Sequence, residues 1–477
     1  MGQTKTTENK LTDEQKAIVK TNLDKQDILK IIAFAGTGKT TTLASYALNR
    51  PNQRFLYVAF NKSMQLDAQR KFPDNVRCRT SHALAFPRFG SKYKHKLGNP
   101  RVHTVAEALE LTRFDVAKNV WDTLSNYLVS GDWSIGEQHQ PSASAKANPL
   151  KSQPDLISLA RKLWEMMCDE DNDYVSMPHD GYLKLYQISE PELRYHGILL
   201  DEAQDTNPAT AALIQQQNCP RILVGDPHQQ IYRFRGAIDA MQEVRETTTM
   251  YLTHSFRFNQ TYADLANQIL QTFKNELQRI KGVGQTGSLE PVNVPYTLIA
   301  RTNAGLFDEA VSHYHKHSIA YLGTQGLPFS SIKDGYFLNE GKPEKVRDPF
   351  LKRFGDFYTM KEYAKSADDF ELLSLCKVIE TYETVDIPGL IERIKKKTVQ
   401  NPSQADVILT TTHKAKGLEF DHVKLADDFI PLVKDDTLND VDKIDPEEIN
   451  LLYVAITRSR KKLELNEDLE NFMELIN

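Results

Sequence analysis

The sequence predicts an α/β protein with parallel sheets and more than one domain. Short apolar segments with the character of buried strands alternate with helical segments, which is the pattern of a parallel sheet covered by helices. One of these strands runs into a glycine-rich turn that ends in Lys39 and Thr40. The chain has 477 residues, more than a single core usually supports, so we expect about three domains or subdomains.

Composition and charge narrow the class of protein. Hydrophobic residues make up 40% and charged residues 26% of the chain, which is typical of a globular protein. The net charge of −5 gives no general attraction to nucleic acid, so a polyanion would need a locally basic cleft. The four cysteines form no C-x-x-C pair, which argues against a zinc site or a disulfide framework. We expect no membrane segment and an intracellular, reducing location, cytoplasmic or, in a eukaryote, nuclear.

The glycine-rich turn has the features of a phosphate-binding loop. Gly36 and Gly38 permit backbone dihedrals that turn successive N–H groups inward, and the helix expected from Lys39 adds its positive N-terminal end. Lys39 can reach the outer phosphates, and the hydroxyl of Thr40 can bind Mg²⁺. Ala33 stands where the strict pattern has glycine, so the loop alone is also compatible with a glycine-rich surface turn.

The segments around the loop supply further elements of a first sheet. Residues 11–19 predict a short helix with Thr12 as its N-cap. The amide of Gln15 could read the edge of an adenine, or this helix could simply pack on the sheet. A second buried strand at 54–60 precedes another helix, and a short strand then leads into 80–82.

Residues 89–190 are expected to form a helical insertion between strands of the first domain. Most of this region has helical patterns, and a polar stretch at 136–154 has the composition of an exposed loop. A basic cluster in it could touch phosphates or form a solvated face. The members of this cluster are Lys92, Lys94, His95 and Lys96.

The sheet resumes with an apolar strand at 197–200 that ends in two carboxylates. An ATP hydrolase needs one carboxylate at a strand end for the Mg²⁺ shell and a neighbouring one to orient or deprotonate water. We therefore assign Asp201 to the metal and Glu202 to the water.

The next strand, at 222–225, leads into the most diagnostic segment of the chain. Gln229 follows the strand end, where its amide can sense a phosphate. Tyr232 and Phe234 alternate with arginines, a pattern that suits stacking on unpaired bases beside a phosphate backbone. After a further strand, Phe256 and Arg257 offer one aromatic face and one guanidinium.

Taken in order along the chain, these segments resemble the UvrD/Rep-type helicases of superfamily 1. The sequence of residues 225–237, GDPHQQIYRFRGA, is especially similar to the F-box DNA helicase branch of that group, although we expect no F-box ahead of the motor. The resemblance extends over nearly the whole chain. Its motifs are Gln15, 33–40, 80–82, 201–205, 224–237, 255–257, 298–303, 411–420 and 452–458.

The resemblance implies two RecA-like parallel-sheet domains of the P-loop NTPase type, with ATP and Mg²⁺ in the cleft between them. The metal ligands are then Thr40 and Asp201. The catalytic residues implied are Lys39, Glu202, Gln229, Arg257 and Arg458, the last three of which approach the γ-phosphate. The nucleotide-binding residues implied are Gln15 at the adenine, the loop residues Ala35, Gly36, Thr37, Gly38, Lys39, Thr40 and Thr41, then Asp201, Phe256 stacked on the adenine, and Glu419 at the ribose.

The resemblance also implies that single-stranded DNA runs across both domains. Two departures from the family pattern stand out. Thr41 occupies a position where many relatives carry an arginine that sandwiches the adenine, and Phe234 replaces the usual tryptophan. The positions that match the DNA contacts of the family are Phe60, Asn61, Thr80, His82, Tyr232, Phe234 and His413.

The motifs set the expected domain boundaries. The second insertion is short beside that of the large family members, and its basic run at 393–397 could meet duplex phosphates or end a solvated helix. We expect the acidic stretch 435–448 to be a surface loop, and Arg458 could also belong to a solvated basic end with the three basic residues after it. The expected parts are a first domain of 1–88 and 191–255 with the insertion 89–190, and a second domain of 256–322 and 404–477 with the insertion 323–403.

The sequence thus favours an ATP-driven translocase and helicase with 3′ to 5′ polarity that acts on single-stranded DNA and its junctions with duplex. We expect a monomer on DNA. One alternative is a translocase that mainly strips proteins such as recombinase filaments from DNA. Another is a non-motor DNA-binding adaptor that uses ATP only to set its shape; the catalytic set argues against this alternative.

Overall fold

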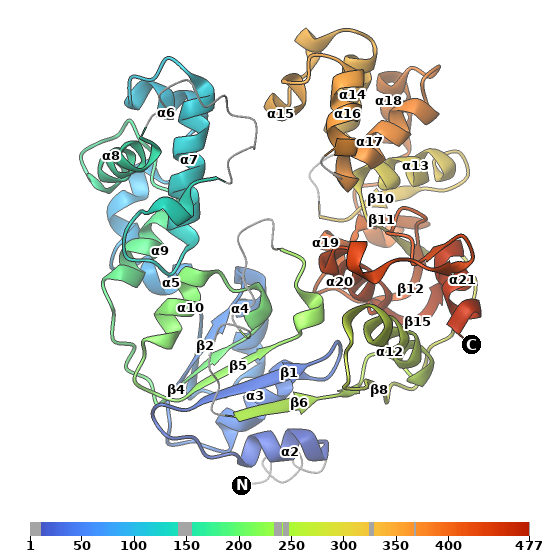
Figure 1. Cartoon of the computed structure of the whole chain (residues 1–477). Helices are drawn as coiled ribbons and strands as arrows, with labels where there is room; N and C mark the ends of the chain where they lie inside the picture. Colours follow the sequence, from blue (N-terminus) through green and yellow to red (C-terminus); the bar gives the residue numbers. More distant parts are fainter. Residues whose placement is uncertain are drawn as a thin grey trace. The chain divides into compact units, whose positions relative to one another are not determined.

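The computed structural model describes residues 11–141, 155–232, 241, 248–323, 329–366 and 369–476. The chain forms two compact units, Met1–Ala33 with Gly38–Leu252, and Phe34–Thr37 with Thr253–Asn477. Each unit contains a parallel β-sheet with helices packed on it (Figure 1). The predicted α/β class is confirmed.

The first sheet has six strands in the order β3-β2-β4-β5-β1-β6, and every pair is parallel. Every residue of β2, β4 and β5 is buried because helices cover both faces of the sheet. Strand β5 lies between β4 and β1, and all three are parallel. The segments that follow β4 and β1 therefore begin at the same end of the sheet, where the carboxyl ends of the strands meet. The strands are β1 (Ile28–Ala33), β2 (Phe55–Ala59), β3 (Val76–Thr80), β4 (Gly197–Leu200), β5 (Arg221–Gly225) and β6 (Thr248–Leu252).

Different helices cover the two faces of this sheet. On one face, α2, α3 and α4 pack through residues such as Ile18, Leu43 and Ala68. On the other face, Ile214 of α10 shares a hydrophobic cluster with residues such as Leu56 of β2. These helices are α2 (Asp13–Lys20), α3 (Lys39–Leu48), α4 (Lys62–Lys71) and α10 (Pro208–Gln215).

The region between β3 and β4 is largely helical. Its helices bury a hydrophobic cluster of their own, which includes Val120, Leu163 and Leu183. The amphipathic α7 and α8 make the main helix pair of this cluster (Figure 1). The helices are α5 (Ser81–Ala85), α6 (Val102–Ala108), α7 (Phe114–Val129), α8 (Leu156–Cys168) and α9 (His179–Ile188), with a 3₁₀ segment at Gly90–Lys96.

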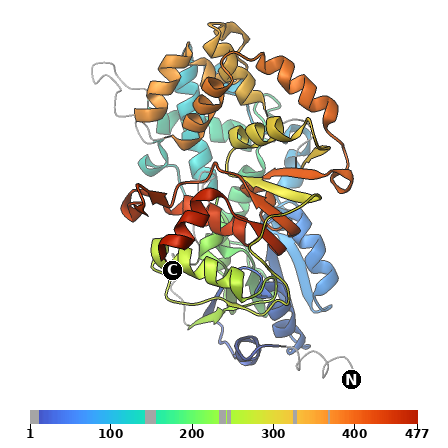
Figure 2. The same cartoon turned by 90° about the vertical axis from the view of Figure 1, so that its right-hand side faces the viewer.

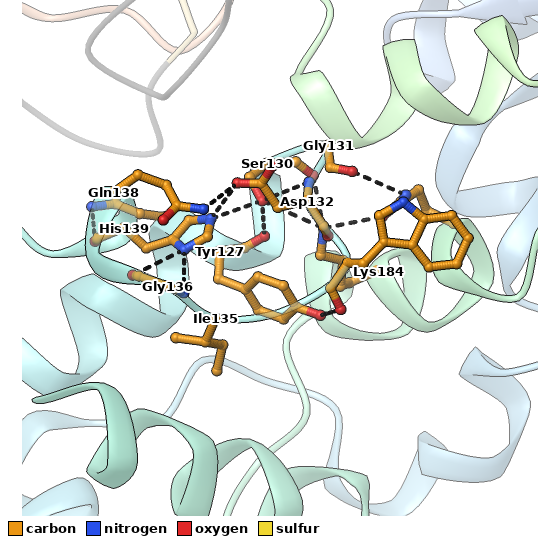
Figure 3. Close-up of polar contacts among 12 residues, drawn as sticks. Tyr127, Ser130, Gly131, Asp132, Ile135, Gly136, Gln138, His139 and Lys184 are labelled. Carbon is orange, nitrogen blue, oxygen red and sulfur yellow. Dashed lines mark hydrogen bonds and ion pairs between the residues drawn. The ribbon is translucent and has the colours of Figure 1, made fainter.

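A buried lysine holds the loop after α7 against α9 (Figure 3). Lys184 is fully buried. Its ammonium donates to the carbonyl oxygens of Ser130 (2.8 Å) and Asp132 (2.7 Å) and to Oε1 of Gln187 (3.0 Å). It also lies 4.4 Å from the ring centroid of Tyr127. These contacts satisfy the carbonyl of Ser130, the C-cap of α7, which has no partner within the helix, and that of Asp132 in the loop after it.

His139 closes the same loop (Figure 3). Its Nδ1 accepts the N–H of Gly136 at 3.0 Å, which places the proton on Nε2. Nε2 lies 2.9 Å from Oδ2 of Asp132 and 3.2 Å from Oγ of Ser130. The Ser130 hydroxyl donates to the carbonyl of Tyr127 at 2.8 Å. These hydrogen bonds hold the loop after α7 in place.

The second sheet has five parallel strands in the order β10-β11-β9-β12-β15. The acidic stretch 435–448, predicted as a surface loop, includes the short strand β14 (Thr437–Leu438), which pairs antiparallel with β13 (Val433–Lys434) just before the stretch. It ends in the first turn of helix α20. The strands of the main sheet are β9 (Tyr296–Ala300), β10 (Ile319–Tyr321), β11 (Val407–Thr411), β12 (Phe420–Leu425) and β15 (Ser459–Glu464).

The two faces of the second sheet carry different helices. One face packs on α12 (Gln260–Lys274), α20 (Pro446–Ile456) and α21 (Glu467–Ile476). The other face packs on α13 (Asn303–His313) and on the helices between β10 and β11, which share one core with it. Figure 2 shows those helices, in orange, gathered at one end of the unit. They are α14 (Ser330–Asn339), α15 (Pro349–Lys352), α16 (Phe357–Ser366), α17 (Phe370–Thr381) and α18 (Ile387–Lys397).

The structure describes the state of the cysteines and the character of the helices. All four cysteines are free thiols; Cys78, Cys219 and Cys376 are buried and Cys168 is partly exposed. In the part of the chain that the structure describes, no helix has the length and apolar character needed to cross a membrane.

Replacement of the buried lysine should destabilise the first unit. In Lys184→Met three oxygen atoms lose their shared donor, so we expect the free energy of unfolding at pH 7 to fall by about 1–3 kcal/mol. Burial lowers the pKa of Lys184 from 10.5 to about 8. Between these values the unfolded chain retains a proton that the folded chain has released, so the wild-type protein gains stability relative to the variant as the pH rises.

Urea unfolding followed by circular dichroism between pH 7 and pH 10 measures this difference. Lys162→Met, which changes an exposed lysine on α8, is the control. An equal loss in both variants, or a difference that shrinks as the pH rises, would contradict the role of Lys184.

Candidate functional site

The predicted phosphate loop connects β1 to α3. Gly36 and Gly38 have φ angles of +76° and +77°, in the left-handed region that glycine adopts without a Cβ penalty. Gly38 is the N-cap of α3 and contributes no side-chain cap. The first N–H groups of α3 can therefore serve an anion.

Residues 34–37 of the loop pack within the second unit. The N–H of Ala35 donates to the hydroxyl of Tyr453 at 3.1 Å. The N–H of Phe256 donates to the carbonyl of Gly36 at 2.9 Å. The loop backbone is thus fixed by hydrogen bonds from sequence-distant segments.

Lys39, at the start of α3, meets the two carboxylates that follow β4. Its ammonium lies 3.0 Å from Oε2 of Glu202, and both side chains are largely buried. Asp201 is 2% exposed. The hydroxyl of Tyr57 donates to its Oδ2 at 2.5 Å, and the N–H of Glu202 donates to its Oδ1 at 2.9 Å. The structure therefore brings together the lysine of the first motif and the acids of the second.

Burial and mutual charge set the protonation of this group. Burial raises the pKa of Asp201 to about 6, repulsion from Glu202 adds to the rise, and Lys39 opposes it. For Lys39, burial acts to lower the pKa, but the carboxylates of Glu202, Asp201 and Asp226 outweigh burial and raise the pKa. The site thus contains one lysine that stays protonated and more carboxylates than this one positive charge can balance. A further cation would stabilise this arrangement.

A chain of amides links these carboxylates to the segment after β5. Nε2 of Gln204 donates to Oε2 of Glu202 (2.7 Å) and to Oδ2 of Asp205 (3.1 Å), and its Oε1 accepts the N–H of Asp226 (3.1 Å). Nε2 of Gln229 donates to Oδ2 of Asp226 at 2.7 Å. Gln229 is therefore connected to Glu202 through Asp226, which uses both its carboxylate and its backbone N–H, and through the side chain of Gln204.

The donor set fits a magnesium ion that binds together with phosphates. Within the described ranges, no group of three or more His, Cys, Asp or Glu side chains is arranged to hold a metal. The predicted ligands are the hydroxyl of Thr40, on the first turn of α3, and the carboxylate of Asp201. Mg²⁺ commonly takes only one or two protein oxygens and keeps water and substrate phosphates in its other positions.

Gln15 is engaged at the start of α2. Thr12 is its N-cap, as predicted, in a capping box: Oε1 of Gln15 accepts the N–H of Thr12 at 3.0 Å. Nε2 of Gln15 donates to Oγ1 of Thr42 at 3.1 Å, so the amide ties α2 to α3. Its contact with adenine stays a prediction, as does the contact of Thr41, which is exposed on α3, with the nucleotide.

Besides the loop residues, the second unit contains the predicted nucleotide residues Phe256, Arg257 and Glu419. The side chain of Phe256 is 48% exposed. Nε of Arg257 donates to Oε1 of Glu419 at 2.8 Å, and its Nη1 donates to the carbonyl of Thr457 at 2.9 Å. The predicted γ-phosphate and ribose contacts thus form an ion pair with each other in this structure.

Arg458 is buried, with 1% exposure, so the alternative of a solvated basic end is wrong for this residue. Its Nε donates to the carbonyl of Val454 (2.8 Å), and its Nη2 donates to Oγ1 of Thr457 (3.0 Å). The last carbonyls of a helix carry negative partial charge, which stabilises a guanidinium at the end of α20. The three basic residues that follow form ion pairs with Asp421 or Glu290; they are Arg460, Lys461 and Lys462.

Three of the predicted DNA residues of the first unit lie around one cavity. Phe60, His82 and Tyr232 line a cavity of about 290 Å³ beside Asp201. The rings of Phe60 and Tyr232 stack, with centroids 5.9 Å apart and planes 15° apart, and Phe60 is 43% exposed. Nε2 of His82 lies 3.0 Å from Oδ1 of Asp180.

The remaining predicted DNA residues have local structural roles or lie elsewhere. The side-chain oxygens of Asn61 and Thr80 accept backbone N–H groups as the N-caps of α4 and α5. His413 lies in the short helix α19 (Thr412–Ala415) of the second unit. Phe234 lies outside the described residues.

Sequence reasoning missed Tyr57 and Gln204. Tyr57 is the one residue with a side-chain hydroxyl in the apolar strand β2, and a buried tyrosine hydroxyl needs a partner, so this signal was present. Gln204 lies within a motif quoted for the family resemblance, but the sequence does not reveal that its amide faces both Glu202 and Asp226.

Two family models match the chain. Residues 195–467 match the UvrD-like helicase C-terminal domain, and residues 15–235 match an AAA domain. The two matched ranges together extend from the capping box of α2 to the start of α21.

Several curated proteins are similar in sequence. F-box DNA helicase 1 of Gallus gallus is 35% identical over 509 residues, which cover 98% of this chain and 50% of that protein. F-box DNA helicase protein 1 of Schizosaccharomyces pombe is 33% identical over 518 residues, with 98% and 58% covered. ATP-dependent DNA helicase UvrD2 of Mycobacterium bovis is 23% identical over 335 residues, with 57% and 47% covered. The chain spans about half the length of the curated relatives it matches.

Gly36 should not tolerate a methyl group. A Cβ at this position would lie 2.5 Å from Oγ of Ser255 and 2.6 Å from Cβ of Arg257, in addition to the strain of a positive φ. Gly36→Ala should therefore lower the thermal unfolding midpoint and remove binding of a fluorescent ATP analogue. Gly341→Ala is the matched control, because Gly341 has a φ of +65° with no atom within 4 Å, so that only the backbone cost of about 1–2 kcal/mol applies. Equal melting shifts with nucleotide binding kept in both variants would contradict the packing argument.

Proposed function

The chain belongs to the UvrD-like helicase family, and on this premise we propose that it is a motor that uses ATP and Mg²⁺ to move along single-stranded DNA in the 3′ to 5′ direction and to unwind duplex DNA. Its substrates are single strands and their junctions with duplex, and a monomer is the working form. Such a motor acts where ATP and DNA meet, so an intracellular location is part of the proposal.

One contact carries the proposal: the ammonium of Lys39 lies 3.0 Å from Glu202, and Asp201 is the residue before it. The loop before Lys39 has two glycines with positive φ. A phosphate cradle, a fixed cation, a metal ligand and a carboxylate for water are the parts that phosphoryl transfer requires.

The residues around this contact divide the work. The N–H groups of residues 36–38 and the ammonium of Lys39 hold the phosphates, and Thr40 and Asp201 hold the metal. When bound, MgATP supplies the phosphoryl group and part of its charge compensation. Glu202 orients water and accepts its proton.

The ion pair in the structure also suggests how hydrolysis is restrained. A carboxylate paired with an ammonium is a weak base, because the pair stabilises the ionised form. Glu202 gains basicity when Lys39 turns toward a phosphate. Activation of water is thereby tied to the presence of the nucleotide.

The remaining nucleotide contacts are assigned by position in the family motifs. Gln229, Arg257 and Arg458 act at the γ-phosphate, Phe256 stacks on the adenine and Glu419 binds the ribose. Arg257 and Glu419 form an ion pair in this structure. When the nucleotide binds, this pair separates, so that Arg257 binds the γ-phosphate and Glu419 binds the ribose.

The stacked rings of Phe60 and Tyr232 support a DNA contact in the first unit. An exposed aromatic face binds an unpaired base without regard to its sequence. The other assigned contacts are Asn61, Thr80, His82, Phe234 and His413. The division into two RecA-like domains, with insertions at 89–190 and 323–403, remains part of the proposal.

Paired unwinding substrates test the polarity. With ATP and Mg²⁺, a duplex with a 3′ single-stranded tail should be separated, and the matched duplex with a 5′ tail should not, because the motor must load on the tail and move toward the junction. Gel separation of labelled strands measures both, with a blunt duplex as the control. Unwinding of the 5′-tailed duplex alone contradicts the polarity, and ATP turnover that DNA does not stimulate contradicts the motor. Displacement of streptavidin from a biotinylated strand without unwinding would identify a motor that mainly strips proteins from DNA.

Removal of the loop lysine should separate catalysis from DNA binding. Lys39→Ala should lower DNA-stimulated ATP turnover at least about a hundredfold, because it removes both the phosphate contact and the partner of Glu202. Its affinity for single-stranded DNA should stay within about threefold of wild type, because Lys39 is not part of the cavity lined by Phe60 and Tyr232. Lys20→Ala, at an exposed position on α2, is the control. Substantial turnover by Lys39→Ala would rule out this loop as the catalytic site.

A further inference from the structure

A second cavity of the first unit lies along the free edge of its sheet. It has a volume of about 1000 Å³. Its lining includes strand β3, which is the outermost strand and pairs with β2 on one side. The start of α4 and residues 192–195 contribute other parts of its wall.

The register of the sheet directs two arginines toward this cavity. Arg77 pairs with Leu56, and Arg79 pairs with Val58. Paired residues of neighbouring strands point to the same face of a sheet. Leu56 and Val58 belong to the buried core of that face, so the face changes from apolar to basic at its last strand.

The cavity carries an excess of positive charge. Among the residues that the structure describes, five Lys or Arg and two Asp or Glu side chains line it, in a chain whose net charge is −5. Arg194 and Glu192 are 3.5 Å apart, but their side chains are 85% and 78% exposed, so this pair neutralises little. The lining side chains are the basic Arg54, Lys62, Arg77, Arg79 and Arg194 and the acidic Asp74 and Glu192.

The same cavity adjoins the predicted DNA face. His82 lines both this cavity and the one that contains the stacked pair Phe60 and Tyr232. Two partly exposed aromatic side chains, Phe86 and Tyr195, also belong to its lining. A groove lined by both cationic and aromatic side chains suits an unpaired nucleic-acid strand, because its phosphates bind cations and its bases stack on aromatic rings.

We propose that this cavity, the β3 groove, holds the backbone of single-stranded DNA that continues past Phe60 and Tyr232. The inference rests on the proposed function, because it extends the path of the strand on which the motor moves. The groove supplies phosphate contacts that do not depend on base sequence. Two competing roles for Arg77 and Arg79 are protection of the free edge of β3 from pairing with another chain and binding of an acidic peptide.

Binding of oligonucleotides of graded length tests the groove. Labelled oligothymidylates of about 6 to about 24 nucleotides bracket the usual site sizes, and fluorescence anisotropy gives their affinities. Arg77→Ala/Arg79→Ala removes two positive charges from the groove. Arg70→Ala/Lys71→Ala removes the same charge from exposed positions at the end of α4 and is the matched control.

Wild-type affinity should rise with oligomer length beyond the shortest members. In Arg77→Ala/Arg79→Ala this gain should fall about tenfold or more, and for long oligomers the slope of log affinity against log salt should decrease by about 0.7 for each lost phosphate contact. Arg77→Lys/Arg79→Lys should recover most of both effects, because an ammonium also neutralises a phosphate. The control should match wild type.

Four outcomes would overturn the proposal that the β3 groove binds DNA. Equal losses in the groove variant and the control would show a general effect of charge. Aggregation of the alanine variant, with unchanged affinity of its soluble fraction and of the lysine variant, would show edge protection. A peptide site would be shown if the wild-type protein binds a polyglutamate peptide and Arg77→Ala/Arg79→Ala does not, while the variant keeps its affinity for long oligomers. Failure of the wild-type protein to bind an oligomer of any length would overturn the proposed function together with the groove.

Discussion

The site depends on the burial of opposite charges where the carboxyl ends of the central strands of the first sheet meet. Lys39, Asp201 and Glu202 lie in a largely buried position, where an unpaired charge would cost several kcal/mol. The cost is tolerated because each charge has partners: the ammonium has Glu202, and Asp201 accepts hydrogen bonds from Tyr57 and from the backbone. The strand order β4-β5-β1 keeps these partners within reach of one another.

Contiguous motifs explain why much of the site could be predicted. The glycine loop and the two acids after β4 each occupy a few consecutive residues, and the chemistry of a strand end limits what such residues can do. That the loop and the acids lie together followed from the expectation of a parallel sheet, because the carboxyl ends of parallel strands lie at the same end of the sheet. The α/β class itself rests on the same alternation of strands and helices, which is a local property of the sequence.

Contacts between distant residues explain what could not be predicted. Tyr57 and Asp201 are 144 positions apart, and Arg257 and Glu419 are 162 positions apart. A run of basic residues after α20 suggested solvent exposure, whereas the carbonyl of Val454, in the last turn of that helix, accepts a hydrogen bond from Arg458 in the interior. Charge patterns in a sequence indicate exposure only when no helix end or carboxylate lies nearby to accept the charge.

The two insertions differ in how they are joined to their sheets. The helices between β3 and β4 have a hydrophobic core of their own, in which Leu213 of α10 is a member from outside them. The helices between β10 and β11 instead share one core with α13 and the strands β9 and β11. A cavity made in this shared core would be felt by the sheet directly, since packed interiors transmit local changes.

The burial of the native thiols has a practical consequence for spectroscopy. Burial raises the pKa of Cys78 and Cys376 to about 11 and that of Cys168 to about 12, and it also raises the pKa of Cys219. Because the thiolate is the reactive form, maleimide dyes should react slowly with these four side chains at neutral pH. A cysteine placed by Phe114→Cys or Tyr358→Cys, at positions that are 63% and 72% exposed, would then accept a dye selectively. Fluorescent labels could therefore follow each insertion during turnover without prior removal of the native cysteines.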